Sequence, residues 1–408
     1  MASKRNLLIV VPRLPWPLSS GGDQAIYNGI AAVKDECNVY VTYMIEEKEK
    51  NAADRLYMES VMGGVKFIPF ENKCRSFARF YEMCVRRSRN LFFPRVTNDF
   101  YRMFEMDRLP SGFLEHINRL VKKYSIDLVQ VEMLREIAAG LALPDGVKRI
   151  FIHHELGFVR NELTLETVGG TVYRKAAVAA NKAMEIGLLN EYDAVVTLSE
   201  TDRLKLIDKG VVVPVHASFS VVKLNDKPVA AECSSTELSY LGPEKHVPNV
   251  VAVRWFLENC WEDLLNKNPD YHLRIIGKWS SPTVSKLTSK YRNLRFCGFV
   301  ENLEDELAGT VMIVPLTIGS GIRMKIIEAA NMNVPVVTTS VGVEGLGFTN
   351  GVNCLIADTP EDFVKAIESL SEEGLRNSII RSAKDHISGF SLEKLGENRL
   401  AIYEKVCS

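Results

Sequence analysis

The stretch of sequence that decides the fold is VMIVPLTIGSGIRMKIIEAANMNVPVVTTSVGVEGL, residues Val311–Leu346. Its apolar runs are short and are separated by glycine, and a helical pattern lies between them. It predicts, in chain order, a strand, a glycine loop, a helix, a second strand and a turn: Val311–Pro315, Gly319–Gly321, Ile322–Met332, Pro335–Thr339 and Gly342–Gly345. Apolar strands that alternate with helices are typical of a parallel sheet that is covered on both faces.

The glycine loop before the helix predicts an anion site. A helix start presents free backbone N–H groups and the positive end of the helix dipole. Arg323 and Lys325 lie in the predicted first turn, where cations are unfavourable unless a negative group binds there. Glu328, one turn later, can accept hydrogen bonds from sugar or ribose hydroxyls. The pattern favours a nucleotide-sugar site; the alternative is that both cations solvate a helix end and Glu328 forms a surface ion pair.

Composition restricts the class of protein. The chain has 408 residues, which predicts two domains, and 46% hydrophobic with 25% charged residues is ordinary globular composition. A formal net charge of −1 does not indicate a nucleic-acid partner. The first residues lack a signal-peptide pattern, uncharged runs are too short to span a bilayer, and the eight cysteines form no CxxC. We therefore expect a cytoplasmic protein without a metal site or cofactor.

The N-terminal half alternates strands with helices up to a linker. Predicted strands are Leu7–Val11, Val39–Met44, Val65–Phe70, Asp127–Glu132, Arg149–His153, Ala194–Leu198 and Val211–Val215. Predicted helices are Gly22–Asp35, Gly112–Tyr124, Val172–Asn190 and Thr201–Lys209. Residues 218–236 lose this periodicity and gather Pro, Asn, Ser and Thr, as linkers do.

The C-terminal half repeats the pattern. Besides the opening stretch, it predicts strands Leu238–Leu241, His272–Ile276, Leu294–Cys297 and Cys354–Ala357, and helices Asn249–Asn266, Pro360–Leu370 and Leu392–Val406. Glycines recur after strand ends, at the carboxyl edge where open α/β sheets bind ligands. We expect two Rossmann-like domains, 1–217 and 237–388, that face each other across a cleft, followed by the terminal segment 389–408.

These motifs resemble the retaining glycosyltransferases of family 4, which have the GT-B fold. The resemblance covers roughly residues 237–370 and is carried by Tyr240–Gly242, Pro248–Asn249, Trp255–Phe256, Leu273–Gly277, Gly298–Val300 and Pro315–Leu346. It implies that the last helix crosses back to the N-terminal domain. One position departs from the family, because Ser320 stands where the first of two glutamates is common.

The resemblance implies roles for the C-terminal residues. Arg323 and Lys325 would stabilise the diphosphate leaving group without a metal, and Glu328 would bind the ribose. Further donor contacts would come from the loops after the strands: Gly242, Phe299, Val300, Gly319, Ser320, Gly321 and Ile322. The donor would be UDP- or GDP-linked. A plain turn is the alternative for the glycines.

In the N-terminal half, two groups of residues are candidates for the transferred sugar or the acceptor. The first is the loop Gly21-Gly22-Asp23, with Asp23 binding an acceptor hydroxyl. The second is the end of the strand Arg149–His153, where His154 is the counterpart of a family histidine; His153, Glu155 and Arg160 complete the set. Strand alternation predicts that one histidine faces inward and the other outward. A tight turn and structural histidines are the alternatives.

Residues 72–110 interrupt the strand–helix rhythm with nine Lys or Arg, four acids and eight Phe or Tyr. This composition suits contact with anionic lipid headgroups or a lipid-linked acceptor. The alternative is a helical insertion that packs its aromatic side chains on the domain and exposes its arginines to solvent. The leading hypothesis is a transferase that acts on a glycan, lipid-linked or protein acceptor. A nucleotide-sugar epimerase and a non-catalytic binding relative are the alternatives.

Overall fold

The computed structural model describes residues 4–18, 20–45, 48–71, 84, 109–219, 221, 234–319 and 321–408. Ser320, most of the basic segment 72–110 and residues 222–233 of the predicted linker therefore lie outside the described residues. The chain divides into two compact units. Unit 1 comprises Met1–Phe219 and Leu395–Ser408, and unit 2 comprises Ser220–Lys394.

Unit 1 is built on a parallel sheet with the order β3-β2-β1-β4-β5-β6-β7. Its strands are β1 (Arg5–Val10), β2 (Cys37–Met44), β3 (Lys66–Phe70), β4 (Leu128–Glu132), β5 (Lys148–His153), β6 (Ala194–Thr197) and β7 (Val215–Ala217). The central strands are mainly apolar because helices cover both faces, and β4 also buries Gln130 and Glu132. The strand predicted at Val211–Val215 was wrong in its position: Pro214 has no N–H to donate to the sheet, so β7 begins after it.

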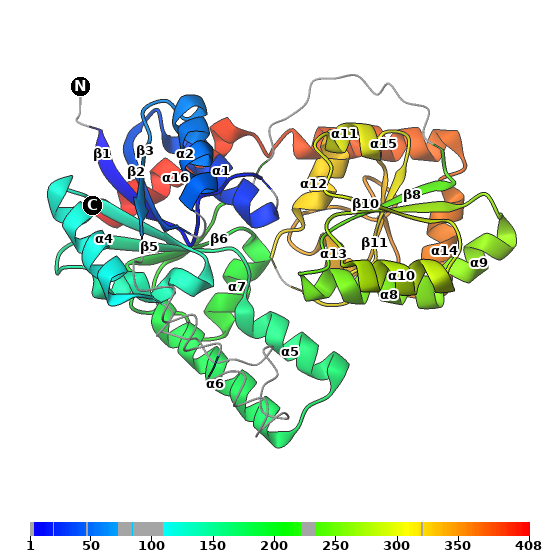
Figure 1. Ribbon diagram of the computed structural model, residues 1–408, viewed down its shortest axis with the longest axis horizontal. Helices are drawn as coiled ribbons and strands as arrows, with labels where there is room; N and C mark the ends of the chain where they lie inside the picture. The colour runs from blue at the N-terminus through cyan, green and yellow to red at the C-terminus, as the bar shows by residue number, and fades with distance from the viewer. Residues whose placement is uncertain are drawn as a thin grey trace. The chain divides into compact units, whose positions relative to one another are not determined.

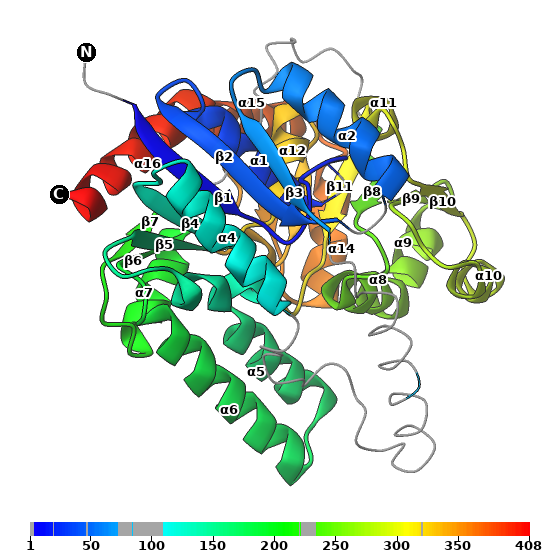
Figure 2. The ribbon, with the colours of Figure 1, turned by 60° about the vertical axis from the view of Figure 1, so that its left-hand side comes forward.

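The helices of unit 1 flank this sheet (Figure 1). They are α1 (Gly21–Val33), α2 (Lys48–Val61), α4 (Ser111–Lys123), the 3₁₀ helix η3 (Leu134–Ala142), α5 (Gly157–Val168), α6 (Val172–Leu189), α7 (Glu200–Asp208) and α16 (Leu392–Cys407). Helices α5 and α6 run side by side as a hairpin (Figures 1 and 2). The sequence did not predict α2 or α5.

The last helix, α16, belongs to the fold of unit 1, as the crossover prediction required. Ile402, Tyr403 and Val406 are buried, and Gly396 packs so closely on α1 that an added Cβ would lie 2.5 Å from the Ala32 carbonyl oxygen. The chain thus returns to unit 1 after completing unit 2.

Unit 2 has a second parallel sheet, with the order β10-β9-β8-β11-β12-β13. Its strands are β8 (Glu237–Leu241), β9 (His272–Ile276), β10 (Leu294–Gly298), β11 (Val311–Val314), β12 (Val336–Thr338) and β13 (Leu355–Ile356). Every strand that the sequence predicted in this half is present within one or two residues, and the α/β prediction is confirmed.

The helices of unit 2 are α8 (Val247–Asn259), α9 (Trp261–Lys267), α10 (Ser281–Lys290), α11 (Leu303–Leu307), α12 (Met324–Asn331), α13 (Ser340–Val343), α14 (Pro360–Ser369) and α15 (Glu373–Ile387). Helices α8 and α10 lie on one side of the sheet, and α12 and α15 on the other (Figure 1). No helix among the described residues combines the length and apolarity needed to cross a bilayer.

Two predicted elements of unit 2 were wrong in detail. The single long helix at Asn249–Asn266 is two helices, because Cys260 has φ −122° and ψ −32° and interrupts the helical backbone. The turn at Gly342–Gly345 begins as the short helix α13, whose start is capped by Thr339 accepting from the Gly342 N–H.

Each sheet has one point where the strand order reverses, and open α/β sheets bind ligands there, outside the carboxyl ends of the strands. In unit 1 this point lies between β1 and β4, and in unit 2 between β8 and β11. The glycine loops that the sequence analysis identified follow β1, β8 and β11, so the topology places them at these two positions.

Candidate functional site

The loop after β11 leads into α12 through two glycines with positive φ, Gly319 (132°) and Gly321 (80°). Residues with a side chain rarely adopt positive φ, which explains why glycine occupies both positions. The helix begins at Met324, later than predicted, because Arg323 has φ −88° and ψ 80° and is the N-cap residue. Arg323 therefore precedes the helix, and Lys325 is its second residue.

Lys325 is held by residues of β8 and α8. Its Nζ lies 3.1 Å from Asn249 Oδ1 and 3.5 Å from the Tyr240 hydroxyl, and it stands 4.5 Å from the centre of the Tyr240 ring. Burial lowers the pKa of Lys325 to about 7, helped by the neighbouring Arg323 cation and opposed by Glu328. The ammonium thus lies in the region where β8 and β11 are neighbours.

Arg323 is buried, with 7% of its surface exposed, and its Nη1 donates to the Gly321 carbonyl. A Cβ added to Gly319 would lie 3.3 Å from Arg323 Nη2 and 3.8 Å from Pro248, near the start of α8. The glycine loop, the start of α12 and the start of α8 therefore meet around two cations. Backbone N–H groups and two positive charges at one place suit a diphosphate.

Gly242 has a different neighbour from the one that the resemblance implied. A Cβ there would lie 2.6–2.7 Å from the amide atoms of Asn249. Asn249 donates through Nδ2 to the Pro243 carbonyl and accepts from Tyr240 and Lys325. Gly242 thus leaves room for the side chain that holds Lys325.

The remaining donor candidates of unit 2 differ in exposure. Glu328 is only 9% exposed on α12, so its alternative as a surface glutamate is wrong. Phe299 is 54% exposed, with Lys278 Nζ 5.6 Å from its ring centre. Val300 and Ile322 are half-buried against the core of the unit.

In unit 1, Gly21 and Gly22 are the first residues of α1, not part of a free loop. A Cβ on Gly22 would lie 2.5 Å from the Met133 side chain, which follows β4, so this glycine permits contact across the point where the strand order reverses. Asp23 is buried, forms an ion pair with Arg13 at 2.9 Å and accepts from the Ser20 hydroxyl at 2.7 Å. Its carboxylate therefore stabilises the start of α1.

The two histidines at the end of β5 each pair with a buried glutamate. His153 Nε2 lies 2.9 Å from Glu185 Oε1 of α6, and His154 Nε2 lies 2.6 Å from Glu132 Oε2 of β4. The predicted inward–outward alternation was wrong in one respect: helices cover both faces of the sheet, so neither side chain is exposed.

Glu185 also accepts from the backbone N–H groups of Gly157 and Phe158, which start α5. Neither Glu185 nor Glu132 was identified from the sequence. A glutamate at a strand end was the only available signal for Glu132, and Glu185 gave none within its helical pattern. The other two candidates, Glu155 and Arg160, form an ion pair with each other at 2.9 Å.

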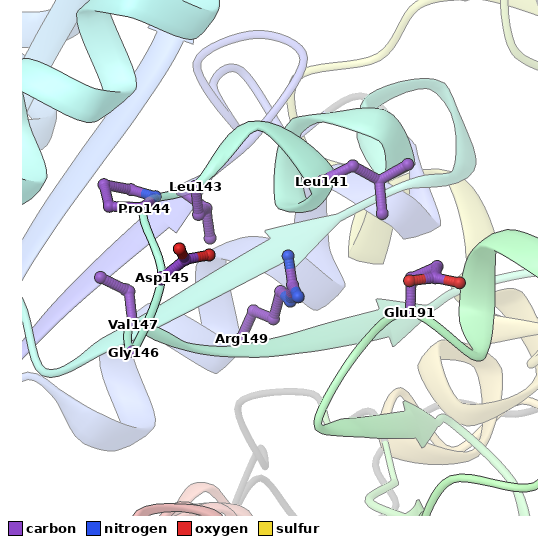
Figure 3. Close-up of a pocket in the computed structure, with 8 residues that line it drawn as sticks. All are labelled: Leu141, Leu143, Pro144, Asp145, Gly146, Val147, Arg149 and Glu191. Atoms are coloured by element: carbon purple, nitrogen blue, oxygen red, sulfur yellow. The ribbon is translucent and has the colours of Figure 1, made fainter.

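A pocket of about 480 Å³ lies elsewhere in unit 1 (Figure 3). Its lining includes Arg149, Asp145 and Glu191, and Arg149 is near the amino end of β5. Parallel sheets bind ligands at the opposite, carboxyl edge. We therefore do not assign this pocket to the candidate site.

Comparison with known proteins agrees with this arrangement. Residues 237–373, which contain the cations, the glycine loop and Asn249, match the family described as "Glycosyl transferases group 1". The matched residues all lie within unit 2. A protein of Klebsiella pneumoniae, described as an uncharacterized 44.6 kDa protein in the cps region, is 22% identical over 380 residues, 90% of this chain and 91% of that protein.

Solved structures are similar to the chain over both units. TarM of S. aureus, solved as a variant with fondaparinux, α-GlcNAc-glycerol and UDP, has a TM-score of 0.71 at 11% identity and 98% and 99% coverage. HepE of Anabaena, solved with UDP and glucose, has a TM-score of 0.67 at 12% identity, with the same coverage of both chains. Sucrose-phosphate synthase of Thermosynechococcus elongatus has a TM-score of 0.67 at 14% identity, and the match again covers 98% of this chain and 99% of the other. The fold is GT-B.

Within the part of the chain that the structure describes, no group of three or more His, Cys, Asp and Glu side chains is placed to hold a metal ion. Metal independence nevertheless stays a prediction, as does the cytoplasmic location.

Proposed function

We propose that this protein is a glycosyltransferase that moves a sugar from a UDP- or GDP-linked donor to a glycan or lipid-linked acceptor, with retention of anomeric configuration and without a metal ion. Lys325 and Arg323 at the start of α12 carry the proposal. Transfer leaves a diphosphate whose negative charge grows in the transition state, and preorganised cations and N–H donors stabilise that charge.

Two relatives support the donor class. HepE was solved with UDP and glucose, and TarM with UDP and α-GlcNAc-glycerol. The Klebsiella relative lies in a cps region, which favours polysaccharide biosynthesis as the process. Retention rests on the resemblance to family 4. The basic segment 72–110 is the proposed contact with a lipid-linked acceptor or an anionic membrane surface, and a protein acceptor is the further possibility.

Nucleotide binding tests the donor part of the proposal. Thermal unfolding is measured with UDP, GDP, ADP, CMP and their common sugar conjugates, since a ligand that binds the native state raises the Tm. We expect stabilisation by one diphosphate nucleotide and its sugar conjugate. No Tm shift with any of them would favour the non-catalytic alternative, and conversion of the donor without acceptor to an epimer would favour the epimerase; neither alternative is favoured by the family match.

Charge removal tests the site. The double variant Arg323→Ala, Lys325→Ala is expected to lower turnover by roughly 10²-fold or more and to reduce the nucleotide-dependent Tm shift. Lys286→Ala with Lys290→Ala on α10 removes the same charge from an exposed helix of the same unit and is the matched control. Equal behaviour of the two double variants would reject the site assignment. Turnover of the unaltered enzyme in EDTA is expected to persist.

A further inference from the structure

A buried hydrogen-bonded chain in unit 1 connects His154 to the C-terminal helix. His154 Nε2 lies 2.6 Å from Glu132 Oε2, and Gln130 Nε2 donates to Glu132 Oε1 at 2.6 Å. The Tyr403 hydroxyl of α16 donates to Gln130 Oε1, also at 2.6 Å. Gln130, Glu132 and Tyr403 are each at most 2% exposed.

The sheet geometry explains why these side chains meet. Gln130 and Glu132 are two residues apart on β4, so they lie on the same face. Their partners across the sheet are Ile150 and Ile152 of β5, and His154 continues that face two residues later. Helix α16 covers the same face and brings Tyr403 to Gln130.

This series of hydrogen bonds determines which nitrogen of His154 carries the proton. An ionised carboxylate only accepts hydrogen bonds. Glu132 accepts from the Gln130 amide on one oxygen, and its other oxygen therefore favours a proton on His154 Nε2. In the neutral ring this leaves a lone pair on Nδ1.

His154 Nδ1 is buried and has no hydrogen-bond partner among the residues that the structure describes. A buried acceptor without a donor is destabilising, so such atoms in native proteins commonly mark a place for a ligand or water. His154 follows the last residue of β5, at the carboxyl edge where this type of sheet binds ligands.

We propose that Glu132 is a positioning residue that holds His154 with its proton on Nε2, so that Nδ1 accepts a hydrogen bond from a hydroxyl group of the sugar substrate. Tyr403, through Gln130, fixes the Glu132 carboxylate and ties this arrangement to the C-terminal helix. The inference rests on the proposed transferase function for the substrate contact, whereas the position of the ring proton depends on unit 1 alone.

The variant Glu132→Gln tests the proposal because it keeps size and reverses hydrogen bonding. An amide can donate to Nε2, which moves the ring proton to Nδ1 and removes the acceptor. Nitrogen-15 NMR of histidine-labelled protein is expected to report an Nε2–H ring for His154 in the unaltered chain and an Nδ1–H ring in the variant, with His154→Gln used for assignment among the seven histidines. We expect kcat/KM to fall about 10- to 100-fold.

Glu200→Gln is the matched control, since Glu200 is an exposed glutamate of unit 1 that pairs with Arg203. It should retain both kcat/KM and the His154 ring signal. Tyr403→Phe should keep the Nε2–H ring and lower kcat/KM by a smaller factor, because Gln130 Oε1 no longer accepts a hydrogen bond from the hydroxyl at position 403. An Nδ1–H ring in the unaltered chain, or Glu132→Gln with unchanged kcat/KM, would overturn the proposal.

The NMR result separates this inference from the proposed function. If no nucleotide raises the Tm and no transfer occurs, the proposed function fails although His154 can still show the Nε2–H ring. If transfer occurs and Glu132→Gln leaves kcat/KM unchanged, the transferase function stands and the role of Glu132 is rejected.

Discussion

At the scale of single residues, Lys325 combines a positive charge with an environment that disfavours it. The start of α12 and the nearby Arg323 both raise the cost of the ammonium, and burial contributes most to the lowered pKa of about 7. Asn249 Oδ1 accepts a hydrogen bond from the ammonium and offsets part of this cost. A bound diphosphate would offset more, which makes ligand binding and the protonation of Lys325 interdependent.

This dependence predicts a pH effect on nucleotide affinity. The free protein loses the Lys325 charge as pH rises through about 7, whereas a bound diphosphate raises the pKa and retains the proton. Affinity should therefore be constant below pH 7 and weaken from pH 7 to about 9. Calorimetry at pH 8 in buffers of different ionisation enthalpy should detect proton uptake. Lys325→Met should bind more weakly at pH 6 and show no uptake; uptake that persists in this variant would assign the proton to another group.

At the scale of elements, the junction of β8 with α8 depends on the absence of a side chain at Gly242. Asn249 occupies the space of its Cβ and connects the Pro243 carbonyl, Tyr240 and Lys325. The start of α8 is thereby joined to the start of α12. Small changes at this junction should affect stability and the position of Lys325 together.

We expect Gly242→Ala to lower the free energy of unfolding by about 1–3 kcal/mol, because the methyl group must displace the Asn249 amide from close packing. Urea unfolding measures the change. Gly187→Ala is the matched substitution: it lies inside α6 with nothing within 4 Å of an added Cβ, and it should stabilise by about 0.5–1 kcal/mol. A Gly242→Ala protein as stable as the unaltered one would show that the Asn249 contacts contribute little.

At the scale of the whole molecule, the chain order and the compact units do not coincide. Unit 1 consists of the N-terminal part and the last helix, so its core is complete only when the C-terminus has been added. Buried side chains of α16, Tyr403 and Ile402 among them, face unit 1.

Removal of residues 395–408 should therefore destabilise unit 1 selectively. Calorimetry of the truncated protein is expected to show an early transition that belongs to unit 1 and a later one near the original Tm of unit 2. Nucleotide ligands should still shift the later transition. A single transition that remains at the original temperature would show that α16 adds no stability to unit 1.

The sequence by itself determined the strands other than β7, the glycine loops and the presence of two cations near the start of α12. These features are local: a strand buried on both faces is mainly apolar along its length, and positive φ suits glycine at Gly319 and Gly321. It did not identify α5, the break at Cys260 or the N-cap position of Arg323, because their backbone depends on the packing around them.

Only the tertiary structure decided which side chains hold the candidate site. Glu132 and His154 are 22 residues apart, Lys325 and Asn249 are 76 apart, and Tyr403 is 273 residues from Gln130. Their hydrogen bonds follow from the strand order, which makes β4 the neighbour of β5 and β8 the neighbour of β11, and from the return of α16 to unit 1. Strand order is set by the joint burial of all the apolar faces, and no local stretch of sequence contains that information.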